Sequence, residues 1–394
     1  MSTRTITNVR AVLPDRVLDD ATIVIEDDRI AAIRAGGARG APAVDGQGMV
    51  LMPGLIDTHS DGLEKEMNPR RTAVFPPDFA LGSFERRVRS AGITTVVHGL
   101  AYQDRPRIGR SVGTARQIYE LIETRRCSPS AAVEHRVLYR VEARDATSLD
   151  PLLVDLQHGR TAGLAAALVS FEDHTPGQGQ YRDVTQFEVA IDPADIPDGM
   201  TVEEYVQVLK AEGDSLIELR DRNLDRLIPL ARDGRITMLA HDAENPDQVV
   251  AAHDAGATVS EFPLTLDAAK EARSREMVVV MGGPNALRGQ SHAGNASARE
   301  LVATDLCDVI ASDYMPSSLL ASVFSMAAEG LCPLHRAVGL VTSGPAQMIG
   351  DPDRGRLEEG ALADLILVDD SGPWPEPIAV TCATDGALTG ALHR

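Results

Sequence analysis

The sequence predicts an α/β protein, a (β/α)8 TIM barrel beside a small β domain. Apolar strands alternate with amphipathic helices through the middle of the chain, and eight such strands can be counted. Short strands rich in β-branched residues lie before and after this region. A doubly wound open sheet is the alternative fold, and it is disfavoured because no glycine fingerprint follows the first strand of the alternating region.

Length and charge set the first limits on function. The chain has 394 residues, of which 43% are hydrophobic and 24% charged, so it can bury a large core as an ordinary globular protein does. The formal net charge of −20 argues against nucleic-acid binding, because a polyanion would be repelled at long range. A small anionic substrate in a locally basic pocket remains compatible with this charge.

The cysteines and the hydropathy pattern indicate the compartment. The four cysteines are far apart and form no CxxC pair, so we expect reduced thiols and neither disulfides nor a thiolate zinc site. The N-terminal stretch MSTRTITNVRAVLPD lacks the apolar core of a signal peptide, and no apolar run is long enough to span a membrane. We therefore expect a cytoplasmic protein without a membrane partner.

The first part of the chain is predicted to be β-structure. Three aliphatic, β-branched segments cover residues 6–13, 21–26 and 29–33. Asp27-Asp28 and Gly36-Gly37 interrupt this region with turn signals. The region is too small to be a complete domain by itself.

The middle of the chain supplies the barrel. The predicted strands cover residues 51–57, 93–98, 136–142, 165–173, 236–241, 258–262, 277–281 and 308–313. Helical stretches between them include residues 112–125, 202–232, 246–255 and 264–275. After Gly350 two more strands follow, at 363–368 and 378–381. We expect residues 1–53 and 350–394 to form the small β domain together, and residues 54–349 to form the barrel.

Polar side chains follow nearly every predicted barrel strand. In a barrel of this kind the catalytic groups lie at the C-terminal strand ends. The strand-end residues are His59, Asp61, His98, Glu142, Glu172, His174, His241, Glu261 and Asp313. One such histidine is usually a hydrogen-bonded structural residue, and one such aspartate is often a helix cap. Burying all of these polar side chains without partners would cost several kcal/mol of folding free energy. The set therefore predicts a metal site that pairs them. Histidine with carboxylate and no cysteine suits Zn²⁺, Mn²⁺ or Fe²⁺.

Several of these stretches resemble a known family. GMVLMPGLIDTHSD, LAHD, ASDY and GRLEEGALADLILVD are similar to segments of the amidohydrolase superfamily. Within it, DGLEKEMNPRR, EDHTPGQGQY, FPLTLDAAKEAR, MGGPNALRGQSHAGN and SDYMPSSLL resemble the branch of α-D-ribose 1-methylphosphonate 5-triphosphate diphosphatases of the carbon–phosphorus lyase pathway. The chain departs from these patterns at Asp61, which replaces the second histidine of a His-x-His motif, and at Gly62 and Arg71.

The resemblance implies a metal-dependent hydrolase barrel with a small β-sandwich domain. Its implied metal ligands are His59, Asp61, Glu142, His174, His241 and Asp313. Asp313 would also take the proton from the attacking water. Glu172 rivals Glu142 as a bridging carboxylate. The implied cofactor is one divalent ion or two, Zn²⁺ first, with Mn²⁺ or Fe²⁺ as alternatives.

A triphosphate substrate also needs cationic partners. Cationic residues in or near the strand-end segments are Lys65, Arg70, Arg71, Arg140, Arg182 and Arg288. The predicted partners are Lys65, Arg70, Arg288 and His292, with Arg288 favoured because it lies in a glycine-rich loop. The expected partner is a small phosphorylated sugar, and a homo-oligomer is compatible with the sequence. The rival predictions are a deacylase or deaminase acting on a C–N bond, and a silent scaffold subunit of a phosphonate complex.

Overall fold

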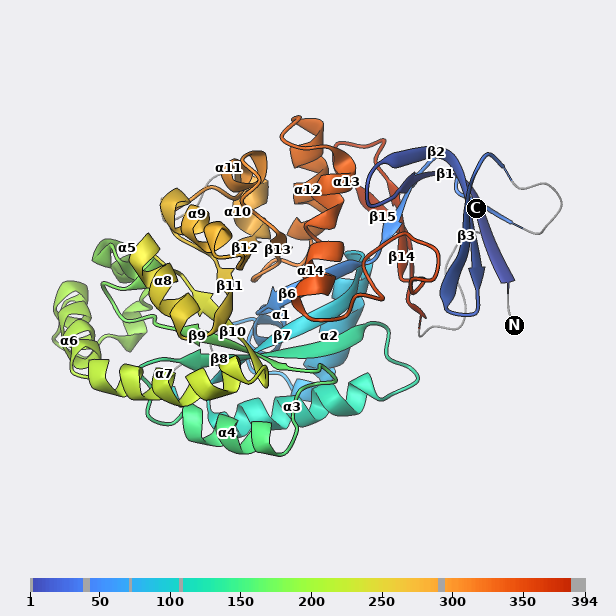
Figure 1. The fold of residues 1–394 in the computed structure, drawn as a ribbon. Coiled ribbons are helices and arrows are strands. Elements are labelled where there is room, and N and C mark those ends of the chain that lie inside the picture. The colour runs from blue at the N-terminus through green and yellow to red at the C-terminus, as the bar shows by residue number, and fades with distance from the viewer. Residues whose placement is uncertain (1–2, 38–42, 71–72, 106–108, 290–294, 384–394) are drawn as a thin grey trace.

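The computed structural model describes residues 3–37, 43–70, 73–105, 109–289 and 295–383. It contains two sheets, a parallel one of eight strands and a mixed one of seven (Figure 1). None of the described helices is long and apolar enough to cross a membrane.

The parallel sheet confirms the predicted barrel. Its strands are β6 (Leu55–Ser60), β7 (Ile93–Tyr102), β8 (Glu134–Glu142), β9 (Ala167–Glu172), β10 (Ile236–His241), β11 (Ala257–Glu261), β12 (Val278–Gly282) and β13 (Val309–Ala311). They pair in chain order, and each pairing is parallel. The interior is filled by aliphatic side chains from successive strands, such as Ile56, Val97, Leu138 and Leu239. It is therefore a packed core, as expected for eight strands.

Backbone hydrogen bonds close the barrel between its first and last strands. The Asp61 N–H donates to the Asp313 carbonyl at 2.7 Å, and the Asp313 N–H donates to the His59 carbonyl at 2.9 Å. These bonds lie at the C-terminal ends of β6 and β13. Barrel closure therefore brings residues 59–61 and 313 together.

The two chain ends form the second sheet. Its strands are β1 (Thr3–Val12), β2 (Val17–Glu26), β3 (Arg29–Ala35), β4 (Val44–Asp45), β5 (Val50–Pro53), β14 (Leu365–Asp369) and β15 (Glu376–Thr381). The strand order is β15-β14-β5-β1-β2-β3, with β4 on β1. A sandwich was predicted, but the described strands pair into one continuous mixed sheet, because β5 pairs with both β1 and β14.

One predicted strand belongs to both sheets. The apolar run over residues 51–57 is divided at Gly54 into β5, which lies in the small sheet, and β6, which lies in the barrel. A Cβ atom on Gly54 would lie 2.2 Å from Oγ1 of Thr94, so the chain can cross here only without a side chain. An apolar run does not reveal such a division, because both halves are buried.

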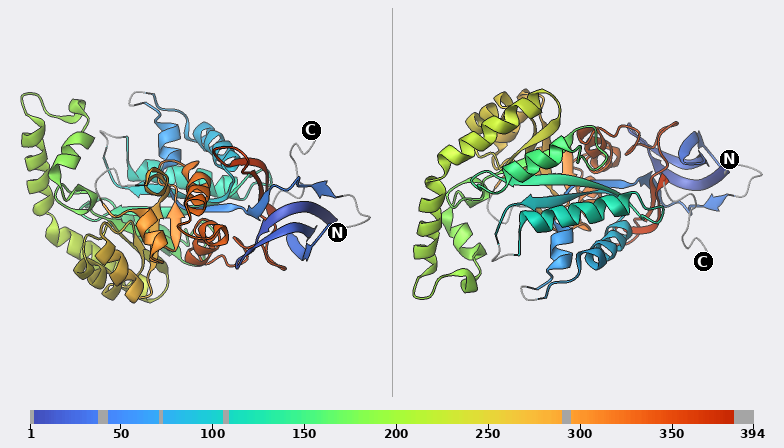
Figure 2. Two further views of the ribbon diagram at one scale, coloured as in Figure 1. Left: turned by 90° about the horizontal axis from the view of Figure 1, so that it is seen from above. Right: turned by 90° about the horizontal axis from the view of Figure 1, so that it is seen from below.

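Helices surround the barrel strands (Figure 2). They are α1 (Gly62–Met67), α2 (Pro77–Ser90), α3 (Val112–Arg126), α4 (Leu149–Gln157), α5 (Val184–Ala190), α6 (Val202–Asp214), α7 (Ile217–Arg232), α8 (Pro246–Asp254), α9 (Leu266–Ser274), α10 (Gly283–Arg288), α11 (Ala298–Ala303), α12 (Ser318–Ala328), α13 (Leu334–Gly339) and α14 (Ser343–Met348). The stretch predicted as helical over 202–232 is thus two helices. The break follows Gly213, Asp214 and Ser215, whose helix propensities are low.

Candidate metal centre

The predicted ligands lie at one end of the barrel. His59 lies near the end of β6 and Asp61 directly follows it, Glu142 ends β8, His174 follows β9, His241 ends β10 and Asp313 follows β13. His59 is 1% exposed and Glu142 is 5% exposed, so these polar groups lie in the protein interior. Their placement at strand ends agrees with the sequence pattern, while their roles as ligands remain predictions.

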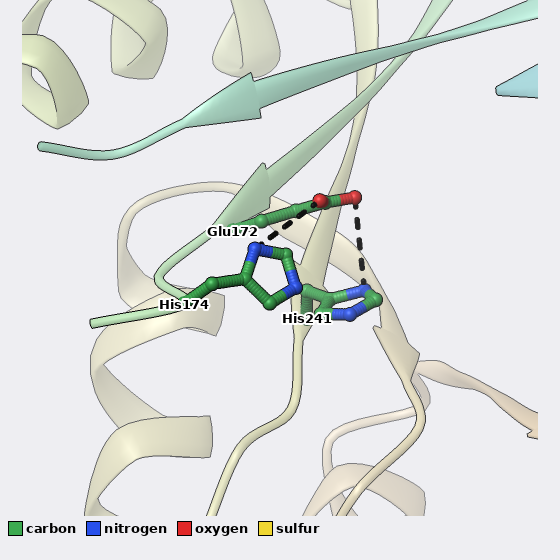
Figure 3. A group of neighbouring side chains, drawn as sticks. All are labelled: Glu172, His174 and His241. Carbon is green, nitrogen blue, oxygen red and sulfur yellow. Dashed lines mark ion pairs between the residues drawn. The ribbon is translucent and has the colours of Figure 1, made fainter. Parts of the chain in front are cut away.

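Glu172, His174 and His241 form a compact group (Figure 3). Within the described part of the chain, only this set offers three or more potential ligand atoms that all lie within 4.8 Å of one another. Nδ1 of His174 lies 3.8 Å, and Nδ1 of His241 lies 3.9 Å, from a Glu172 oxygen. Two imidazoles and one carboxylate match the donor preference of a divalent zinc, manganese or iron ion, so the residues present fit such an ion.

Glu142, the rival of Glu172, bonds to His174. Its two oxygens accept the backbone N–H of His174 at 2.9 Å and Nδ1 of the same residue at 3.0 Å. Burial would favour the neutral acid, but His174 holds the pKa of Glu142 below its usual range. Since Glu142 accepts at Nδ1, the His174 ring has Nε2 available for an ion.

Arg140 lies between two of the carboxylates. Its Nη1 donates to both oxygens of Asp61 at 2.7 Å, and its Nε and Nη2 donate to Glu172 at 2.9 Å. Despite burial, Arg140 lowers the pKa of Asp61 well below its usual range and that of Glu172 to about 2. Arg140 was among the arginines expected to face phosphate, but its guanidinium is instead engaged by carboxylates. It keeps Asp61 and Glu172 ionised.

Glu261 was among the polar strand-end residues but was not predicted as a ligand, and it contacts two residues that were, His59 and His241. Its oxygens accept Nδ1 of His59 at 2.8 Å and Nδ1 of His241 at 2.7 Å. The sequence signal was a glutamate directly after a buried strand, as with Glu142 and Glu172. Although burial opposes it, the neighbouring carboxylates raise the pKa of His241 to about 9, with Asp242 contributing most.

Asp313 is held in an unusual backbone conformation. Its φ angle is 56°, in the left-handed region that few non-glycine residues adopt. Asp242 and Phe262, which follow β10 and β11, have φ angles of 56° and 54°. Burial, and then the charge of Asp61, raise the pKa of Asp313 to about 6. A carboxyl group with such a pKa is suited to exchange protons near neutral pH.

Asp57 anchors the strand end that carries Asp313. Its Oδ1 accepts the Ser312 N–H at 2.9 Å, and its Oδ2 accepts the Ser312 hydroxyl at 2.5 Å. Burial raises the pKa of Asp57 to about 6, although the bonds from Ser312 oppose this. The carboxyl is 0% exposed, so its charge at neutral pH has a free-energy cost.

Asp57→Asn should stabilise the metal-free protein at alkaline pH. The folded pKa of about 6 exceeds the unfolded value of 3.8, so the protonated form stabilises the fold at low pH and this contribution is lost as pH rises through about 6. Two pKa units correspond to about 3 kcal/mol. Denaturant unfolding should show the variant more stable than wild type by up to about 3 kcal/mol at high pH. A difference that did not shrink towards acidic pH would contradict this origin.

Two of the predicted cationic residues lie near Asp313 or its neighbour. Nζ of Lys65 lies 5.6 Å from the ring centre of Tyr314, the residue after Asp313. Arg288 and Asp313 line a common cavity of about 110 Å³. Arg70 is exposed, at the loop after α1, and His292 lies outside the described residues. Lys65 and Arg288 have no ion pair within the described part of the chain, so both charges are available to an anion.

A larger cavity opens on the other side of the mouth. Its volume is about 1130 Å³, and its lining includes Glu142, His174, Arg105, Tyr181 and Phe187. The smaller cavity is lined by Asp313 and the larger one by His174, so each reaches one of the predicted ligands.

The fold and the strand-end ligands define an amidohydrolase-type barrel. The model of the amidohydrolase family matches residues 233–386. Solved structures of the same fold include dihydropyrimidinase from Brevibacillus agri, with a TM-score of 0.59, 14% identity and coverage of 99% of this chain and 95% of that one. N-acetylglucosamine-6-phosphate deacetylase from Pasteurella multocida has a TM-score of 0.60, 12% identity and coverage of 98% and 99%. These likenesses concern the fold.

A curated relative gives the family. The chain is 34% identical, over 370 residues, to the α-D-ribose 1-methylphosphonate 5-triphosphate diphosphatase of Escherichia coli (strain K12). The match covers 92% of this chain and 94% of the relative. The chain therefore belongs to the α-D-ribose 1-methylphosphonate 5-triphosphate diphosphatase family, as its motifs indicate.

Proposed function

We propose that this protein hydrolyses α-D-ribose 1-methylphosphonate 5-triphosphate between the α and β phosphates, releasing pyrophosphate and the 5-phosphate. The observation that carries the proposal is the set of groups that lie near Asp313. A carboxyl group able to accept a proton lies beside a centre that fits a divalent ion. Two cations without an ion pair among the described residues lie near it, Lys65 beside Tyr314 and Arg288 in the cavity that Asp313 lines. The activity of the Escherichia coli relative supports the same substrate.

The proposed ligands are Glu172, His174 and His241, with His59, Asp61 and Asp313 completing the centre from β6 and β13. Zn²⁺ is the proposed ion, with Mn²⁺ or Fe²⁺ as alternatives, because imidazole and carboxylate suit all three. When bound, the ion supplies Lewis-acid activation of the attacking water and of a phosphoryl oxygen. Glu142 keeps His174 oriented, and Arg140 keeps Asp61 and Glu172 ionised.

Asp313 is the proposed general base. Its carboxylate takes a proton from the water that attacks phosphorus, and it returns a proton to the leaving pyrophosphate. The left-handed backbone of Asp313 and the bonds of its neighbour Ser312 to Asp57 hold the carboxylate at the mouth. Lys65 and Arg288 offset the negative charge of the phosphate chain by charge-assisted hydrogen bonds.

The second candidate activity is a deacylase or deaminase of the ordinary amidohydrolase type. The metal-replete protein should be incubated with the ribose triphosphate substrate and, separately, with N-acyl and amino-purine or amino-pyrimidine substrates. Release of pyrophosphate, with no product from the C–N substrates, is the expected result. Turnover of a C–N substrate without pyrophosphate release would replace the proposed function by the second one.

Arg288→Ala should weaken substrate binding without changing the metal content. Loss of a hydrogen bond to a charged phosphate costs roughly 1.5–3 kcal/mol, which raises KM by about one to two orders of magnitude. Arg34→Ala is a matched control, because Arg34 is an exposed arginine on β3 of the small sheet. An equal loss on the triphosphate and on a neutral ester would show that Arg288 does not recognise phosphate.

A further inference from the structure

Glu261 lies beneath the metal centre and joins two of its histidines. The side chain is 0% exposed, at the C-terminal end of β11. Besides Nδ1 of His59 and Nδ1 of His241, it accepts the Ser170 hydroxyl at 2.8 Å. Three donors from three different strands therefore converge on one carboxylate.

The chemistry of a carboxylate fixes the hydrogen atoms in this arrangement. Oε1 of Glu261 lies 2.8 Å from Nδ1 of His59, and Oε2 lies 2.7 Å from Nδ1 of His241 and accepts the Ser170 hydroxyl, so each partner faces the carboxylate as a donor. An ionised carboxylate can only accept hydrogen bonds. Nδ1 must therefore carry the hydrogen in both rings, and Nε2 is the only ring atom that either histidine can offer to an ion.

The next residue, Phe262, restricts the same two rings by packing. Its ring centre lies 5.4 Å from that of His59 and 5.4 Å from that of His241. Its φ angle of 54° is unusual for a bulky side chain, which adopts the left-handed region only where the surroundings enforce it. The Phe262 N–H donates to the Val280 carbonyl at 2.9 Å, which holds this turn in place.

We propose that Glu261 is a positioning residue that presents Nε2 of both His59 and His241 to the ion, with Phe262 fixing the plane of each ring. Glu261 is not itself a ligand in this proposal; it acts through the two histidines, whose Nδ1 atoms its oxygens accept. One carboxylate thereby sets the geometry of ligands from two strands, β6 and β10. The inference rests on the metal centre assigned under the proposed function, and it does not depend on the substrate.

Glu261→Gln tests the proposal because it nearly keeps the shape of the side chain while it removes the charge and replaces one accepting oxygen by a donating NH₂ group. The amide keeps one accepting oxygen, but its NH₂ group cannot accept, so one histidine loses its orienting partner. Loss of such a partner lowers metal affinity by roughly 10- to 100-fold. We expect a fall of this size in Zn²⁺ affinity, measured by competition with a chromophoric chelator.

Glu85→Gln is the matched control. Glu85 is also a buried carboxylate, 2% exposed, and it accepts Nε2 of His135 at 3.1 Å outside the proposed centre. The same substitution there should leave Zn²⁺ affinity unchanged. Unchanged affinity in Glu261→Gln would overturn the proposal. A loss as large as that in His241→Ala would also overturn it, because Glu261 would then be a ligand.

A measurement on the wild-type protein avoids any folding defect of the variant. In the ¹⁵N-histidine-labelled, Zn²⁺-loaded protein, nuclear magnetic resonance should show Nδ1–H and a metal-bound Nε2 for both His59 and His241. Metal binding through Nδ1 in either ring would overturn the proposal. Neither experiment uses substrate, so failure of the proposed triphosphate hydrolysis would leave these results separately interpretable.

Discussion

His241→Ala should yield a folded protein that has lost most of its divalent ion and its activity. The substitution removes one of the three donors of the most compact ligand group, and His241 is also bonded to Glu261. The contribution of a catalytic ion is several kcal/mol, so turnover should fall at least about 10³-fold. Elemental analysis after dialysis measures the bound metal, and circular dichroism verifies the fold.

His253→Ala is the control for this experiment. His253 lies in α8, and its side chain is 40% exposed. This substitution should change neither the metal content nor the rate. Should His241→Ala keep a full complement of metal, the ion would have to bind elsewhere in the chain. The same pair of assays on Glu172→Gln and Glu142→Gln would identify the carboxylate ligand, and we expect the larger loss of metal for Glu172.

Asp313→Asn should lower turnover by roughly 10²-fold or more while most of the metal remains bound. Asparagine has nearly the same shape as aspartate, but it cannot accept the proton of the attacking water. In the wild type, the rate should decrease as pH falls, because protonation removes the base. The metal-free pKa of Asp313 is about 6, and a nearby cation favours the ionised form, so the decrease should occur at pH 6 or below.

Rates of pyrophosphate release across this pH range, at saturating metal, test the role of Asp313. The wild type should show the acidic limb, and the residual rate of Asp313→Asn should lack it. If the variant retains the wild-type pH profile, another group accepts the proton. A variant that loses its metal as well would show that Asp313 acts chiefly as a ligand.

The barrel could be predicted from the sequence because its strands are short, apolar and regularly separated by helices. Parallel strands buried on both sides need such runs, and their carboxyl ends must meet at one face. His59, His174 and His241 could be placed at that face for the same reason. The division of residues 51–57 at Gly54 could not be predicted, because both halves of the run are equally apolar.

The pairing of side chains at the centre could not be predicted either. Arg140 and Asp61 are 79 positions apart, and His59 and Glu261 are 202 apart, so their contacts depend on strand tilt and register. Glu142 and Glu172 both end apolar strands, so the sequence does not distinguish them. In the three-dimensional arrangement Glu172 lies near two histidines and Glu142 bonds to one. Arg140 was a candidate phosphate partner because the sequence shows its positive charge but not the carboxylates that lie beside it in the fold.

The pairing of β14 with β5 has a consequence for synthesis on the ribosome. β5 immediately precedes β6, yet the second of its partners, β14, begins only at Leu365. Until that segment emerges, the nascent chain displays one edge of β5, with free backbone N–H and C=O groups. Contacts of such long sequence separation form late and slowly. Chains that terminate early, before Leu365, should therefore depend on chaperones.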